Sequence, residues 1–276
     1  MTEQTPKVKP PAGFLARALA RKRREVENGR RVRPKDELAR AARDRAPARP
    51  WAATLRAPGA AVIAEVKRAS PSAGSLAPDL DAAGRALLFE RSGAAAISVL
   101  TDAAFDGRLD DLRAVADAVT IPVLRKDFLV DPWQVWESRA AGADAALVIV
   151  AALDDEGLAG LVEAAGEAGL GLLVEIHVSE ESSRAVALDA DVIGVNARDL
   201  ASLDVDVDAG LDLLRRLRGE APEAVLVAES GIRGPDDVRR ARRAGADAVL
   251  VGEHLARAAD AGAALAALVD ADHADA

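Results

Sequence analysis

Two charged residues, Glu65 and Lys67, stand near the end of an apolar run in the stretch AVIAEVKRASPSAG (61–74). They are two positions apart, so in a strand their side chains point to the same face. Burying a charge is costly unless the charge is paired or used. A carboxylate and an ammonium group on one buried face suit acid and base chemistry in a pocket, provided that other elements complete its walls.

Several later apolar runs also end in polar residues or glycine. A single glutamate at the end of a strand is most often a solvated loop residue, but acids, bases and amides at corresponding ends of several runs are a stronger signal. Two lysines and three glutamates in one pocket would shift one another's pKa values, which suits general acid and base catalysis near neutral pH. These run-end residues are Lys126, Glu175, Asn196, Arg198, Glu229, Ser230 and Gly252.

The elements that must position these residues alternate from residue 61 onward. Apolar runs without polar alternation are typical of parallel strands buried on both faces. The expected strands are 61–67, 95–100, 121–125, 145–150, 171–175, 191–195, 224–228 and 247–251. The expected helices are 79–92, 108–118, 132–141, 155–168, 180–187, 207–218, 235–244 and 253–269.

This alternation predicts an α/β fold, a (β/α)8 TIM barrel over 61–276, with an open doubly wound sheet as the alternative. An internal echo between RAAGADAALVIV (139–150) and RRAGADAVLVG (242–252) suits repeated βα units. The carboxyl ends of barrel strands form the active-site rim, which is where the polar residues fall. We therefore prefer the barrel.

Residues 1–60 are expected to form an N-terminal helical extension packed on the barrel, within a single domain overall. One charged helix is expected over 14–28 and a second over 36–45, after which the prolines of APARPW break the pattern. The basic run RKRRE lies on the first helix together with acidic residues. We interpret that run as a solvated face.

Composition narrows the function classes. The formal net charge of −9 disfavours nucleic acid and anionic membranes as partners. The absence of cysteine excludes disulfides and thiolate metal sites, and the three histidines lack metal-ligand spacing. No apolar run reaches the ~20 residues that span a bilayer, and the first residues lack a signal-peptide core. We expect a cytoplasmic protein that acts on a small molecule.

A phosphate site is expected where the last two strands meet the first. Late βα loops of such barrels often bind phosphate through backbone N–H groups. Ser230 and Gly231 follow the seventh strand, Gly252 and Glu253 follow the eighth, and Ser70 lies in the loop after the first. Each glycine taken alone is explained by a turn; their clustering favours a phosphate cradle.

Several motifs together resemble the indole-3-glycerol phosphate synthase family. They are IAEVKRASPSAG, VLRKDFLVDPWQVWESRAAGADA, LLVEIH, IGVNARDL, VAESGI and ADAVLVGE, and the likeness covers about 62–255. The resemblance implies a lyase of tryptophan biosynthesis. Such an enzyme converts 1-(2-carboxyphenylamino)-1-deoxyribulose 5-phosphate into indole-3-glycerol phosphate, with loss of CO2 and water and without a metal or organic cofactor. It further implies a monomer, with weak association with other enzymes of the pathway as an added expectation.

The resemblance also implies roles for residues of this chain. Lys126 would be the general acid for ring closure and Glu175 its acidic partner, with Lys67 and Glu65 as acid and base for dehydration; how these four divide the proton transfers stays open. Asn196, Arg198 and Glu229 would hold carboxylate and hydroxyl groups, with Ser230 beside them. Ser70, Gly231, Gly252 and Glu253 would lie at the phosphate, and the aryl pocket would comprise Phe105, Phe128, Leu147 and Leu200.

Two positions depart from the family pattern. Asp102 stands where Thr-Glu usually follows the second strand, and Glu253 stands where serine commonly follows the phosphate-loop glycine. A glutamate there would repel phosphate unless it points away, so we expect weaker phosphate binding at worst. The alternatives are another phosphate-binding barrel, such as a phosphosugar isomerase or a Schiff-base aldolase, and a barrel kept as a scaffold. The last would have shown loss of Lys67, Lys126 or Glu175.

Overall fold

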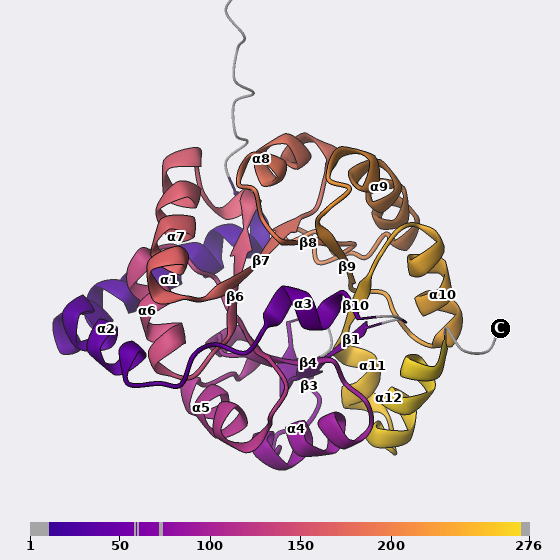
Figure 1. The fold of residues 1–276 in the computed structure, drawn as a ribbon, viewed down its shortest axis with the longest axis horizontal. Coiled ribbons are helices and arrows are strands. Elements are labelled where there is room, and N and C mark those ends of the chain that lie inside the picture. Colours follow the sequence, from indigo (N-terminus) through magenta and orange to yellow (C-terminus); the bar gives the residue numbers. More distant parts are fainter. Residues whose placement is uncertain (1–10, 58, 60, 72–73, 272–276) are drawn as a thin grey trace, which may run out of the picture.

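Eight parallel strands form a closed barrel in the computed structural model, which describes residues 11–57, 59, 61–71 and 74–271 (Figure 1). The first strand pairs with both the second and the last strand of the ring, so the sheet has no edge. The prediction of a (β/α)8 barrel is confirmed, and the open sheet is excluded. The barrel strands are β1 (Ala61–Val66), β4 (Ala96–Leu100), β5 (Val123–Lys126), β6 (Ala145–Ile149), β7 (Gly171–Ile176), β8 (Val192–Asn196), β9 (Val225–Glu229) and β10 (Ala248–Val251).

Helices cover the outside of the ring. The single helix expected over 253–269 is wrong, because the chain is extended at Ala258 and Asp260 then caps a new helix by accepting a hydrogen bond from the N–H of Ala263. Among the described residues, no helix is long and apolar enough to cross a membrane. The outer helices are α4 (Ala82–Arg91), α5 (Leu109–Ala118), α6 (Pro132–Ala140), α7 (Asp155–Ala168), α8 (Ser182–Ala187), α9 (Val207–Glu220), α10 (Pro235–Arg243), α11 (Glu253–Arg257) and α12 (Ala261–Val269).

Short elements lie in the loops at the carboxyl ends of the strands. The loop after β1 folds into an antiparallel pair, β2 (Ala69–Ser70) and β3 (Gly74–Ser75). Three short 3-10 helices, η1 (Ala103–Phe105), η2 (Val150–Ala152) and η3 (Ser179–Glu181), follow β4, β6 and β7.

Each strand points alternate side chains into the barrel and out toward the helices, as the period of two requires. In β1, Val62 and Ala64 pack with the outer helices, whereas Ala61 and Ile63 belong to the apolar cluster inside the barrel. Continuing that alternation places Glu65 on the inner face. The interior is therefore a filled core at one end and a charged pocket at the other.

The N-terminal segment covers both ends of the barrel. α1 (Gly13–Val32) begins beside the loop after β8, where the N–H of Leu15 donates to the carbonyl of Leu200 at 2.9 Å. α2 (Lys35–Arg43) packs beside α6, as predicted within two residues at each end. α3 (Trp51–Leu55), which the sequence did not predict, crosses the centre of the ring at the opposite end (Figure 1).

The repeated GADA stretches share one structural task. Asp144 accepts a hydrogen bond from the N–H of Val123 at 2.8 Å, and Asp247 accepts one from the N–H of Leu226 at the same distance. Each aspartate thereby ties the start of its own strand to the start of the preceding strand in the chain. The internal echo reflects this shared contact at the amino ends of the strands.

Candidate active site

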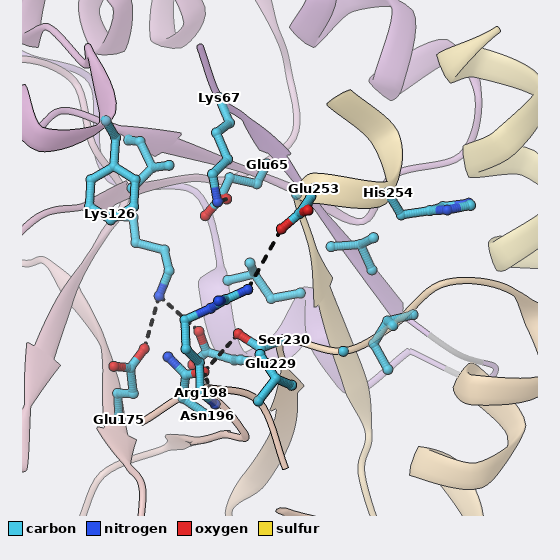
Figure 2. Close-up of a pocket in the computed structure, with 18 of the residues that line it drawn as sticks. Glu65, Lys67, Lys126, Glu175, Asn196, Arg198, Glu229, Ser230, Glu253 and His254 are labelled. Atoms are coloured by element: carbon cyan, nitrogen blue, oxygen red, sulfur yellow. Dashed lines mark hydrogen bonds and ion pairs between the residues drawn. The ribbon is translucent and has the colours of Figure 1, made fainter. Parts of the chain in front are cut away.

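One cavity of about 560 Å³ opens at the carboxyl ends of the strands (Figure 2). All but one of the residues predicted for the site line it. The exception, Ser70, is buried in β2 and is not among the lining residues. The predicted residues that do line the cavity are Glu65, Lys67, Phe105, Lys126, Phe128, Leu147, Glu175, Asn196, Arg198, Leu200, Glu229, Ser230, Gly231, Gly252 and Glu253.

Lys126 stands at the centre of the charged part of the cavity. Its Nζ lies 2.9 Å from Glu175 Oε2 and 2.8 Å from Glu229 Oε2 (Figure 2). Burial lowers the pKa of Lys126, but the carboxylates of Glu175, Glu229 and Glu65 outweigh burial and raise it well above its ordinary value. The lysine is therefore held as a cation in a partly dry site.

The two carboxyl groups that contact Lys126, those of Glu175 and Glu229, differ in charge. Burial raises the pKa of Glu175, but Lys126 and then His177 outweigh burial and hold it well below its usual range. Burial raises the pKa of Glu229, and Glu175 adds to that rise while Lys126 opposes it. A single ammonium group between two buried carboxyls thus favours an ionised Glu175 beside a protonated Glu229.

Space for the Glu229 carboxyl comes from a glycine on the next strand. A Cβ at Gly194 would overlap Glu229 Oε1. That oxygen is buried and has no hydrogen-bond partner among the described residues. It faces Gly194 of β8, whereas the other oxygen, Oε2, contacts Lys126.

Glu65 and Lys67 form a second acid–base pair on β1 and the residue just past it. Lys67 Nζ lies 3.4 Å from Glu65 Oε1 and 5.5 Å from the centroid of the Phe105 ring. A Cβ at Gly252 would overlap Glu65 Oε1, so this glycine makes room for the carboxylate. The glycine that the sequence suggested for phosphate thus has an additional structural reason to lack a side chain.

Asn196 organises the loops after β8 and β9. Its Oδ1 accepts hydrogen bonds from Ser230 Oγ at 2.8 Å and from the N–H of Arg198 at 3.0 Å. Ser230 and Gly231 both have positive φ, 67° and 78°, so the chain turns sharply there and brings its backbone to the cavity. These contacts fix the polar wall opposite Lys67.

Arginines border the expected phosphate end. Glu253 Oε2 lies 3.6 Å from Arg198 Nη2 (Figure 2). Glu253 Oε1 lies 3.1 Å from Arg257 Nε. The carboxylate therefore lies between two arginines at this end of the cavity. The cavity is also lined by three residues that were not predicted, Arg233, His254 and Arg257. Their positions in the loops after the last two strands were the sequence signal that could have indicated them.

An apolar slot adjoins the charged cluster. Phe105, Phe128, Leu147 and Leu200 pack in the same interior cluster as Phe14 of α1. Phe14 meets Phe105 and Phe128 edge to face, with ring centroids 6.2 and 6.0 Å apart. The N-terminal helix thus helps to build the slot.

Buried charges fasten α1 to this rim. Lys22 is 5% exposed, and its Nζ lies 2.9 Å from Asp102 Oδ2 and 2.8 Å from Asp127 Oδ1. The interpretation of RKRRE as a solvated face is therefore wrong for Lys22. Asp102, the departure from the family pattern, also pairs with Arg21 and anchors the helix.

His177 lies beside the charged cluster, although it was not among the predicted site residues. Its Nε2 lies 3.2 Å from Glu175 Oε1, and its side chain is 10% exposed. The missed signal was its spacing: two residues after Glu175, it falls on the same face of the chain.

No group of three or more potential metal-ligating side chains is gathered within the described part of the chain.

Comparison with known proteins finds a family match over most of the chain. The family model described as indole-3-glycerol phosphate synthase matches residues 15–268. The indole-3-glycerol phosphate synthase of Mycobacterium ulcerans (strain Agy99) is 53% identical over 220 residues, 79% of this chain and 80% of that protein. The one from Streptomyces griseus subsp. griseus is 51% identical over 238 residues, 86% and 87% of the two chains.

Solved structures match the fold at lower identity. A 3-hexulose-6-phosphate synthase superposes with a TM-score of 0.62 at 20% identity and covers 76% of this chain and 99% of its own. That likeness supports the barrel alone. The family match and the two relatives go further, because each spans most of the molecule at high similarity, and by them the chain belongs to the indole-3-glycerol phosphate synthase family.

Proposed function

We propose that this chain converts 1-(2-carboxyphenylamino)-1-deoxyribulose 5-phosphate into indole-3-glycerol phosphate, releasing CO2 and water, as a carboxy-lyase of tryptophan biosynthesis. The observation that carries this proposal is the position of Lys126. Its ammonium group lies between Glu175 and Glu229, next to an apolar slot and opposite the Lys67–Glu65 pair. The family match indicates which substrate the chain acts on. The geometry places a proton donor, Lys126, where the ring of that substrate must close.

Ring closure needs one proton at the ketone oxygen. The aromatic carbon that carries the carboxylate attacks the C2′ carbonyl, and the new C–C bond pushes the C=O electron pair onto oxygen. Lys126 donates the proton that neutralises this oxygen, and Glu175 stabilises the cationic ring that results. Loss of CO2 leaves its bonding electrons in the ring and removes that positive charge.

Dehydration needs an acid and a base. The C2′ hydroxyl leaves as water after it takes a proton from Lys67, and Glu65 takes a proton from C1′ so that the C1′–C2′ double bond of indole forms. The two groups lie 3.4 Å apart, so one can return the proton to the other. Over the whole cycle one proton enters from solvent, because a carboxylate is lost as neutral CO2, and this proton restores Lys126.

Both ends of the flexible substrate must be held for the ring carbon to reach the carbonyl. The aryl group would occupy the slot of Phe105, Phe128 and Leu147. The phosphate would bind at the loops after β9 and β10, near Gly231 and Arg257. The carbonyl carbon between these ends would then lie beside Lys126.

The test is a direct assay. Purified protein is mixed with the substrate in the presence of EDTA, and indole fluorescence is followed. The wild type should produce a rise, and Lys126→Met should lower turnover about 10²–10⁴-fold, the usual contribution of a positioned acid. Lys35→Met is the matched control, because the Lys35 side chain is 52% exposed on α2.

The proposal is wrong if the folded wild type, checked by circular dichroism, produces no indole fluorescence. It is also wrong if Lys126→Met keeps the wild-type rate. Borohydride treatment with substrate should leave no covalent adduct on Lys126, since the scheme contains no Schiff base.

A further inference from the structure

His177 lies behind the acid–base centre and takes no part in the proton transfers described above. It follows β7 directly and projects from the same face as Glu175. Its side chain is 10% exposed, and the Glu175 side chain is 1% exposed. Neither ring nitrogen has a hydrogen-bond partner among the described residues, so the buried imidazole depends on ion pairing with the carboxylates beside it.

Both ring nitrogens of His177 face carboxylates. Nε2 lies 3.2 Å from Glu175 Oε1, and Nδ1 lies 3.6 Å from Glu181 Oε2. Glu181 Oε2 also accepts the backbone N–H of His177 at 2.7 Å, which fixes the loop. An imidazole that faces an acceptor at each nitrogen is best matched when both nitrogens carry protons.

Glu175 is thereby held from two sides. Lys126 Nζ lies 2.9 Å from Glu175 Oε2, and His177 Nε2 lies beside Glu175 Oε1. The chain Lys126–Glu175–His177–Glu181 alternates cation and anion from the cavity to the loop at η3. Without His177, the Glu175 carboxylate would keep only Lys126 as an ion-pair partner among the described residues.

We propose that His177 is a positioning residue, which as an imidazolium orients Glu175 and keeps it ionised so that Lys126 stays charged and aimed at the substrate. This inference rests on the proposed function. Burial lowers the pKa of His177, but Glu175 and Glu181 outweigh burial and raise it to about 10. Asp199, in the loop after β8, also interacts electrostatically with His177, which contributes to the lowered pKa of Asp199.

Kinetics test the positioning role. His177→Gln removes the cation and keeps a polar side chain of similar reach. We expect kcat to fall about 10–100-fold with little change in KM, because the ion pair that orients Glu175 is lost while the substrate contacts remain. The acid limb of the pH profile should move to higher pH, because Glu175 loses a cation and its pKa rises. His177→Lys restores the charge and should return the limb toward its wild-type position.

Nuclear magnetic resonance of 15N-labelled histidine provides a readout that needs no substrate. The His177 signal is assigned by its absence from His177→Gln, and we expect both nitrogens to be protonated at pH 8 in the wild type. Glu181→Gln should lower the pH at which this signal titrates. Glu180→Gln, an exposed neighbour, should leave it unchanged.

A neutral His177 at pH 8 overturns the inference, and so does a His177→Gln variant with wild-type kcat and pH profile. A wild type without activity is a different result. It would overturn the proposed function, while the protonation state of His177 would still decide whether this imidazolium holds Glu175.

Discussion

The two ends of the barrel interior use the same inward positions for different purposes. At the amino ends of the strands these positions carry small apolar residues, Ala61, Ala96, Ala145 and Ala248, and Trp51 of α3 packs among them. At the carboxyl ends, beyond a middle layer that includes Ile63 and Leu124, the last inward positions of several strands carry charged side chains, Lys126 among them. The closed end is packed for stability, and the open end holds charges that burial alone would disfavour.

The difference shows how the fold supports a costly site. Burial of apolar area at the closed end stabilises the barrel, whereas each buried charge at the rim needs a partner. Lys126 and His177 each lie between two acidic side chains, and Lys22 contacts three. Substitutions at the two ends should therefore separate stability from activity.

The largest effect on stability is expected at the closed end. Trp51→Ala removes a side chain that is 4% exposed and should lower the free energy of unfolding by about 3–5 kcal/mol. Urea denaturation measures this loss. Initial rates at a temperature where the variant is folded should give wild-type kcat and KM, and a large fall in kcat would show that the two ends are not separate.

A smaller loss is expected where α1 joins the rim. Lys22→Met leaves Asp102 with Arg21 and Asp127 with Arg125, so the cost should be about 2 kcal/mol rather than that of two unpaired charges. KM should rise severalfold, because α1 also carries Phe14 to the aryl slot. Arg23→Met, at the exposed neighbouring position, is the control. Equal stability of the two variants would contradict the anchoring role of Lys22.

The charge of Glu229 should appear in the pH dependence of stability. Burial is the main cause that raises its pKa, from 4.5 to about 8. The folded chain then keeps a proton that the unfolded chain loses between these values. Stability from this group is present below pH 4.5 and lost as pH rises toward 8. Glu229→Gln should flatten that decline in denaturation curves, and exposed Glu220→Gln should not. An unchanged slope in Glu229→Gln would argue for an ionised Glu229 throughout.

The smallest effect is expected at Glu253. Its side chain is 37% exposed and pairs with Arg198 and Arg257, so its contribution to stability should be slight. Glu253→Ser removes a carboxylate that competes with phosphate for these arginines. KM should fall about two- to fivefold at low salt with kcat unchanged, and the gain should shrink as salt screens the charges. A higher KM would mean that Glu253 itself helps to bind substrate.

Much of the barrel was predictable because its signals are local. A parallel strand buried on both faces is a continuous apolar run, and all eight were located within two residues of their observed bounds. α3 was not predictable, because a five-residue helix after two prolines is held by its packing under the barrel rather than by its own propensity. The prediction of one helix over 253–269 was wrong for a related reason. The chain is extended at Ala258, but an alanine in an alanine-rich stretch gives no sequence signal for a break.

The site residues, like the strands, were predictable where their signal is local in the sequence. Lys126, Glu175 and Glu229 stood out because strand ends converge in any such barrel. The burial of Lys22 did not, because its partners Asp102 and Asp127 are distant in sequence and look like ordinary loop acids. Ser70 was expected at the phosphate because of its position after β1, but it is buried in β2 and is not among the residues that line the cavity.

The central claim is that Lys126 protonates the substrate ketone while the aryl slot and the late loops hold the two ends. The most direct measurement is a crystal structure with the alcohol obtained by reducing that ketone, which cannot cyclise. The account predicts the alcohol oxygen within hydrogen-bond distance of Lys126 Nζ, the aryl ring against Phe105 and Phe128, and the phosphate at Gly231. An alcohol oxygen placed at Lys67 instead, with Lys126 still bound only to Glu175 and Glu229, would contradict it.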